Sequence, residues 1–67
     1  MISARNQLKG KVKAIKLGTV MAEIVIETAG GEVVAIISRA SAEAMKIKVG
    51  DTATAIIKAT EVMVAKD

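Results

Sequence analysis

The stretch that decides the fold is residues 8–28, which read LKGKVKAIKLGTVMAEIVIET. Over residues 8–14, lysines alternate with apolar residues or glycine, as in a strand with one face toward solvent. Before this point the apolar residues and glycine stand at even-numbered positions, but Ile15 and Leu17 stand at odd-numbered ones. This switch indicates a β-bulge or a bend near Ala14. Gly18 then ends the run, and residues 19–28 alternate again, with an apolar face formed by Val20, Ala22, Ile24 and Ile26. The sequence therefore predicts two successive strands.

The remaining chain continues in short elements. They are a third strand at residues 32–38 (EVVAIIS), a short helix around residues 41–46 (SAEAMK), a turn at residues 48–51 (KVGD), a fourth strand at residues 52–58 (TATAIIK) and a fifth at residues 61–65 (EVMVA). Gly30 and Gly31 permit the positive φ of a hairpin turn. The third strand is apolar on both faces, so we expect both faces to be covered. This order predicts an all-β fold with one short helix, an OB-like five-stranded Greek-key barrel, with an SH3-like barrel as the neighbouring alternative.

Composition indicates how so short a chain is stabilised. Residues 1–67 form one predicted domain, and a monomer of this size buries only about 60% of its unfolded surface. The chain has no Cys and no His, which excludes disulfides and Cys/His zinc sites. It is 52% hydrophobic without a single Phe, Trp or Tyr. We therefore expect an exposed aliphatic surface and self-association. With no signal peptide and no long apolar run, the sequence predicts a cytoplasmic protein.

Catalysis has little support in these residues. His, Cys and Tyr are absent, which leaves Asp, Glu and Lys as general bases. Glu23 and Glu27 lie on one strand face, where pairing with lysines of the first strand explains them better than an acid–base pair does. The glycines of the AGGE turn precede a strand rather than a helix, so they do not form a phosphate loop. The sequence predicts a protein that is not an enzyme.

Binding of an anion has better support. Ser38 and Ser41 flank the start of the predicted helix, where N-capping is the commoner explanation for a serine. Lys58 ends the fourth strand, where a lysine often places its charge in solvent. Ser3 and Arg5 are two residues apart, so they would share one face of an extended chain. They could equally form an exposed polar arm. Taken together, these side chains and nearby backbone amides supply only hydrogen-bond donors.

A site made of donors suits an oxyanion that carries no proton. Molybdate, tungstate and sulfate are proton-free dianions at neutral pH, whereas phosphate mostly carries one proton. Inside such a site that proton would find no acceptor, at a cost of about 1–3 kcal/mol. The net charge of +3 also suits an anionic ligand.

Four stretches carry a resemblance to a known family. They are SARNQLKGKV at residues 3–12, IETAGGEVVAIISRASAEAM at residues 26–45, KVGD at residues 48–51 and IIKATEVMVA at residues 56–65. These stretches resemble the molbindins, the small Mop-type molybdate-binding proteins. The resemblance covers essentially the whole chain in the expected order. It implies an OB-type barrel whose N-terminal strand is exchanged between subunits, and a homohexamer built as a trimer of dimers.

The resemblance also implies a ligand set shared between subunits. One subunit would give Ser3, Arg5, Lys58 and the backbone amide of Ala59. Its neighbour would give the hydroxyls of Ser38 and Ser41. The ligand would be molybdate or tungstate, held for storage or homeostasis without a catalytic cofactor. A second class of site near the three-fold axis could use the exposed amides of Gly18 and Thr19 in the turn at residues 16–20, KLGTV.

One departure from the family pattern and one alternative function remain. Lys46 stands where many members have a glycine suited to the end of the helix.

The alternative function is that of a small basic barrel that binds nucleic acid through the lysines of the first strand, namely Lys9, Lys11, Lys13 and Lys16. Its affinity would fall steeply with salt. The absence of aromatic residues, on which bases stack, argues against it, and no membrane partner is expected.

Overall fold

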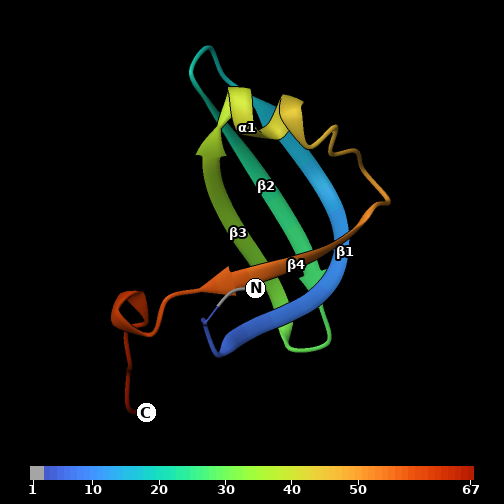
Figure 1. Ribbon diagram of the computed structural model, residues 1–67. Coiled ribbons are helices and arrows are strands. Elements are labelled where there is room, and N and C mark those ends of the chain that lie inside the picture. Colours follow the sequence, from blue (N-terminus) through green and yellow to red (C-terminus); the bar gives the residue numbers. More distant parts are fainter. Residues whose placement is uncertain (1–2) are drawn as a thin grey trace.

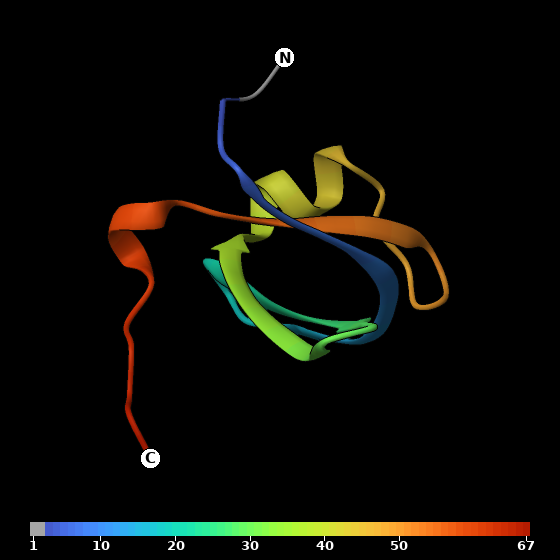
Figure 2. The same ribbon diagram turned by 90° about the horizontal axis from the view of Figure 1, so that it is seen from below.

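The computed structural model describes residues 3–67 as a curled antiparallel sheet with one short helix (Figure 1). Its elements are β1 (Asn6–Leu17), β2 (Met21–Thr28), β3 (Gly31–Ser38), α1 (Arg39–Ala44), β4 (Thr52–Ile57) and the single 3₁₀ turn η1 (Ala59–Glu61). The sheet has four strands in the order β3-β2-β1-β4. Figure 2 shows the sheet curling so that its two edge strands come round toward each other. The fold is therefore mostly β with one short helix, as the alternation pattern predicted.

β1 is the strand that joins the two halves of the sheet. Its first half pairs with β4, from Asn6 opposite Ile57 to Lys11 opposite Thr52. Its pairing with β2 begins at Gly10, so both neighbours flank the middle of the strand. The β1–β2 register shifts between Val12 and Ala14, which confirms the predicted bulge. A bulge bends its strand, and this bend accompanies the change of apolar parity in the sequence.

The core is small and entirely aliphatic. Its buried members are Val12, Ala22, Ile24, Ile26, Ala42 and Ala55. The β2 residues among them are those that the alternation assigned to the apolar face. α1 contributes only its one buried residue, Ala42. A single chain thus buries few large side chains, in keeping with the expected need for self-association.

The outer face of β3 differs from its prediction. The strand is apolar on both faces, but Val34 and Ile36 remain 58% and 57% exposed. No element within residues 3–67 packs over them, because α1 lies toward the end of the sheet (Figure 1). The expectation that both faces are covered is therefore wrong for one chain taken alone.

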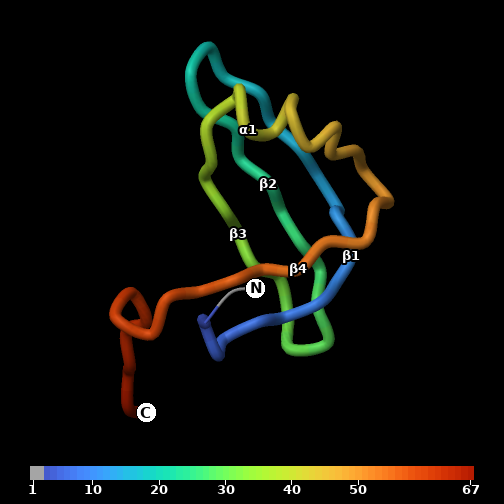
Figure 3. Tube along the Cα trace, viewed as in Figure 1, coloured from blue at the N-terminus to red at the C-terminus, as the bar shows by residue number. Residues whose placement is uncertain are grey.

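The predicted fifth strand is also absent from the chain as described. Residues 61–65 pair with no strand within residues 3–67. The turn η1 follows β4 and carries the chain away from the sheet, as the Cα trace shows (Figure 3). In η1 the Glu61 and Val62 amides donate to the carbonyl groups of Lys58 and Ala59 at 2.9 and 3.4 Å. This local turn replaces the hairpin that a fifth strand in the same chain would need.

Lys46 adopts a conformation that lysine disfavours. It follows the last residue of α1 by two positions and has φ of 53°, in the left-handed region. Its amide still donates to the Glu43 carbonyl at 3.1 Å, which ends the helix. Glycine is the usual residue at this position because it has no Cβ to clash with its own backbone.

Lys46→Gly is therefore expected to raise the free energy of unfolding by about 1 kcal/mol. Urea unfolding followed by far-UV circular dichroism, at fixed protein concentration, measures the change. Lys48→Gly is the matched control, because Lys48 lies in the same loop with ordinary φ and gains no relief of strain. A Lys46→Gly variant no more stable than the Lys48→Gly control would contradict this account.

Candidate functional site

Three of the predicted ligand residues lie together where β1 begins and β4 ends. Ser3, Lys58 and Ala59 line one shallow cavity of about 350 Å³, with Ala4, Ile56 and Thr60. The pairing of Asn6 with Ile57 explains this closeness, because it sets the residues before β1 beside those after β4. The family pattern placed these residues in one subunit, and the β1–β4 register brings them to one place.

The cations of this group keep their charge available. Arg5 and Lys58 are both exposed. The ion pairs among residues 3–67 join Lys13 to Glu27 and Glu32, and Arg39 to Glu43. No carboxylate of the described chain therefore neutralises Arg5 or Lys58. Arg5 does not itself line the cavity, although it stands between Ser3 and the first paired residue of β1.

The two predicted hydroxyls lie together at the start of α1. Ser38 is the N-cap residue, and its Oγ accepts from the Ser41 amide at 3.1 Å. The Ser38 hydroxyl also donates to the Ser41 Oγ at 2.8 Å. The capping explanation is therefore confirmed. A hydroxyl has one donor and two acceptor sites, so the proton of Ser41 Oγ remains free to meet a further acceptor.

Arg39 is a residue that sequence reasoning missed. A cavity of about 580 Å³ is lined by Thr19, Val20, Ser38, Arg39, Ala40 and Glu43. The Arg39 guanidinium donates to the Gly18 carbonyl at 3.2 Å and pairs with Glu43 at 3.5 Å. Arg39 thereby links α1 to the β1–β2 turn and pairs with the carboxylate that lines the cavity together with Ser38. Its position next to Ser38 was the only signal in the sequence.

One amide of the β1–β2 turn, which the sequence analysis considered for a second anion site, is already hydrogen-bonded within the turn. The Gly18 amide donates to the Met21 carbonyl at 2.8 Å, which closes the turn. Gly18 therefore does not offer this donor to an anion. Thr19 lines the cavity beside Ser38 and remains exposed.

The two groups of predicted ligands do not meet within one chain. The cavity beside Lys58 contains no residue of α1, and the cavity beside Ser38 contains no residue of β4 or of the turn after it. Figure 1 shows the end of β4 well removed from α1. A single chain thus offers cations at one place and paired hydroxyls at another.

The acidic residues of β2 have a structural role, as their alternation indicated. Glu23 lies opposite Lys16 in the register, and Glu27 is 3.9 Å from the Lys13 ammonium. A hydrogen bond from Lys13 to Glu32, with the attraction of that carboxylate and of Glu27, raises the pKa of the Lys13 ammonium above its ordinary 10.5. Lys13 thus pairs with Glu27 and Glu32 on an exposed face of the sheet. Residues 3–67 contain no cluster of carboxylates suited to a metal ion.

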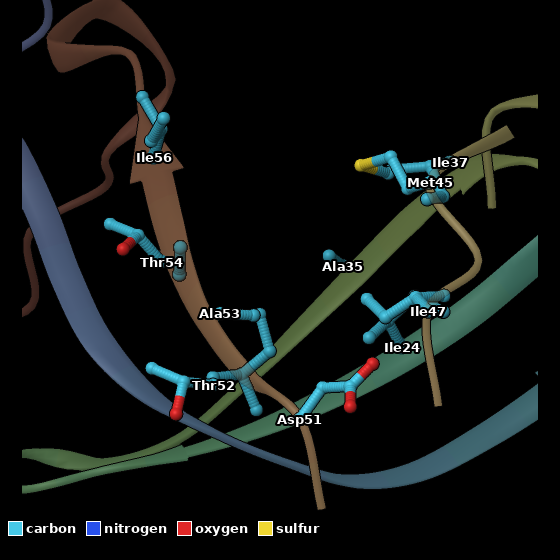
Figure 4. A pocket seen from close by; sticks show the side chains of 12 residues that line it. Ile24, Ala35, Ile37, Met45, Ile47, Asp51, Thr52, Ala53, Thr54 and Ile56 are labelled. Atoms are coloured by element: carbon cyan, nitrogen blue, oxygen red, sulfur yellow. The ribbon is translucent and has the colours of Figure 1, made fainter. Parts of the chain in front are cut away.

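A third cavity, of about 530 Å³, lies on the concave side of the sheet. Figure 4 shows Ile24, Ala35 and Ile37 facing residues of β4 across it. Its only charged lining residue is Asp51, whose carboxylate accepts from the Lys48 amide at 2.8 Å. The hollow is lined mostly by apolar side chains, and no ion pair among residues 3–67 involves Asp51, whereas Glu43 in the cavity beside Ser38 is paired with Arg39. The candidate anion site therefore comprises the other two cavities.

Comparisons with known proteins identify the family of the chain. The model of the TOBE domain family matches residues 2–64. Molybdenum-pterin-binding protein 3 of Clostridium pasteurianum is 58% identical over 64 residues, which are 94% of each chain. The solved structure of MopII from the same organism is 51% identical and superposes with a TM-score of 0.92, covering 98% of this chain and 100% of that one.

A molybdate-binding protein from Sporomusa ovata is a further structural neighbour. It is 47% identical and has a TM-score of 0.92, with 98% of both chains covered. The described part of the chain has no helix long and apolar enough to cross a membrane. Family model, sequence identity and superposition agree over nearly the whole length of the chain. The chain belongs to the TOBE domain family, among the small molybdenum-pterin-binding (Mop) proteins.

Proposed function

We propose that this chain binds molybdate or tungstate, at sites that two subunits complete together. The observation that carries the proposal is the division of its donors. Unpaired cations gather where β1 begins and β4 ends, and paired hydroxyls gather at the start of α1. Neither group alone surrounds a tetrahedral dianion. A second copy, placed with its α1 against the first chain's Lys58, supplies the missing half.

Each residue then has a distinct role. Arg5 and Lys58 of one subunit neutralise the dianion through charge-assisted hydrogen bonds. Ser3 and the Ala59 amide donate from the same subunit. Ser41 of the neighbour donates directly, and Ser38 can turn its own proton from Ser41 to the anion while it still caps the helix. Each of these groups can donate a hydrogen bond, which a proton-free oxyanion accepts.

The assembly that we propose is a homohexamer built as a trimer of dimers. The exposed aliphatic residues of the outer sheet face, including Val34 and Ile36, support contact between copies. In the assembly a strand exchanged between subunits completes each four-stranded sheet as a five-stranded Greek-key barrel. In the described chain β1 pairs with its own β2 and β4, so exchange of the N-terminal strand has no direct support.

We further propose that binding is reversible and serves molybdate storage and homeostasis in the cytoplasm, without catalysis or a catalytic cofactor. The proposed ligands support this role because they are cations and hydrogen-bond donors, and Glu43, the carboxylate that lines the cavity beside Ser38, is paired with Arg39. Reversible capture needs only the charge and the hydroxyls described above.

The proposal predicts selective binding of proton-free oxyanions. In isothermal titration calorimetry we expect molybdate and tungstate to bind, and phosphate to bind roughly 5- to 150-fold more weakly, because the proposed ligands offer its proton no carboxylate or carbonyl acceptor. Sulfate has the same charge and the same tetrahedral shape as molybdate but is smaller. We therefore expect a site that fits molybdate to bind sulfate more weakly. Equally weak binding of molybdate, sulfate and phosphate would refute the proposal.

A further inference from the structure

The cavity beside Ser38 contains an ion pair that the proposed ligand set does not use. This cavity of about 580 Å³ lies between α1 and the turn that joins β1 to β2 (Figure 1). Two charged side chains line it, Arg39 and Glu43. The Arg39 Nε lies 3.5 Å from the Glu43 carboxylate. Within residues 3–67, neither side chain makes an ion pair with any other residue.

Arg39 is held in place through both its backbone and its side chain. Its amide donates to the Val20 carbonyl at 2.8 Å, and its guanidinium donates to the Gly18 carbonyl at 3.2 Å. These two carbonyls belong to the residues on either side of Thr19, which also lines the cavity. Because several contacts fix the planar guanidinium, its charge stays beside Glu43 instead of moving freely in solvent.

The Glu43 carboxylate is the one feature of this cavity that opposes binding of a dianion. It lines the same cavity as Ser38, whose hydroxyl is one of the proposed ligands. A carboxylate accepts hydrogen bonds but donates none, and it repels a second negative charge. Among residues 3–67, the cation that offsets this charge is Arg39.

We infer that Arg39 sets the affinity of the candidate anion site by neutralising Glu43, and not by contacting the anion itself. The inference rests on the proposed function, because it concerns the same site. With the ion pair intact, the two side chains together carry no net charge toward a dianion. Arg5 and Lys58 of the neighbouring subunit then attract the dianion unopposed. Without Arg39, the Glu43 charge acts against them.

The test is a double-mutant cycle, measured by isothermal titration calorimetry with molybdate. Arg39→Gln is expected to weaken binding by about 5- to 30-fold, the effect of one unit charge on a dianion near a protein surface. Combining Arg39→Gln with Glu43→Gln leaves no carboxylate in the cavity lining. We expect this double variant to bind within about threefold of the parent. Both variants lack the guanidinium that contacts Gly18, so the comparison separates charge neutralisation from support of the turn.

Salt dependence gives a second readout that a structural defect would not change. We compare the dissociation constants of Arg39→Gln and the parent in about 0.02 M and about 0.5 M sodium chloride, where the Debye length is about 20 Å and about 4 Å. We expect the ratio of the two constants to fall toward one at the higher concentration, because salt screens the Glu43 charge. A ratio that stays the same would overturn the inference.

Lys13→Gln is the matched control. It removes one positive charge and leaves Glu27 and Glu32 without their ion pair, outside both cavities. We expect it to change the dissociation constant by less than about threefold. A loss as large as that of Arg39→Gln would show that any unpaired carboxylate has the same effect, and would overturn the inference.

The cycle also distinguishes failure of this inference from failure of the proposed function. A parent protein that does not bind molybdate would overturn both. If the parent binds, the inference alone is overturned by an Arg39→Gln variant that binds as tightly as the parent. It is equally overturned by a double variant that binds as weakly as Arg39→Gln, because that result would give Arg39 a purely structural role.

Discussion

Gly10→Ala is expected to lower the free energy of unfolding by at least about 3 kcal/mol, or to prevent folding. A Cβ at Gly10 would lie 2.1 Å from the Glu27 carbonyl oxygen and 2.8 Å from the carbonyl carbon. Both atoms belong to the backbone of β2, so the clash cannot be relieved by turning a side chain. Gly10 also pairs with Thr28 on one side and Ala53 on the other, so any shift disturbs both halves of the sheet.

The measurement is urea unfolding followed by far-UV circular dichroism, at one fixed protein concentration because association contributes to stability. Gly30→Ala is the matched control. The nearest atom to a Cβ at Gly30 is the Thr28 hydroxyl oxygen at 3.8 Å, which is ordinary contact. We expect this control to unfold near the parent midpoint. A Gly10→Ala protein as stable as the Gly30→Ala protein would show that the β1–β2 approach is looser than described.

Removing one cation of the candidate site is expected to weaken molybdate binding by roughly 10- to 150-fold. Arg5→Gln and Lys58→Gln each delete a charge-assisted hydrogen bond, worth about 1.5–3 kcal/mol. Both side chains are exposed and lack an ion pair within residues 3–67, so their loss leaves no carboxylate without a partner. We therefore expect the loss in affinity to occur without a comparable loss in stability.

Calorimetric titration with molybdate measures this effect. Lys16→Gln is the matched control, because it removes the same charge from an exposed residue of β1 outside both cavities. We expect this control to change the dissociation constant by less than about threefold, as for a distant and screened charge. Equal losses for Lys16→Gln and Lys58→Gln would indicate binding through net charge alone and would contradict the site assignment.

The strands of the sheet could be predicted because their signal is local. Alternation of period two placed Ile24 and Ile26 in the core, and the change of parity near Ala14 located the bulge. The fate of residues 61–65 could not be predicted in the same way. Their composition is that of a strand, but a strand needs an edge to pair with, and the described chain turns away from its own free edges.

The residues of the candidate site, and their division between two subunits, are proposals that came from the sequence and from the family resemblance. Hydroxyls and cations without an obvious partner stand out in a sequence, and the family resemblance grouped them. That Lys58 and Ser38 line different cavities follows from the curl of the sheet, which no local pattern encodes. Arg39 was missed because the Gly18 carbonyl that it contacts lies 21 residues away in the chain.

A crystal structure of the protein with molybdate, with molybdenum located by its anomalous scattering, tests the central claim most directly. We expect the metal oxide at a boundary between copies, within hydrogen-bond distance of Arg5 and Lys58 of one subunit and of the Ser38 and Ser41 hydroxyls of its neighbour. Molybdenum bound wholly within one chain, or away from both groups of donors, would contradict the account.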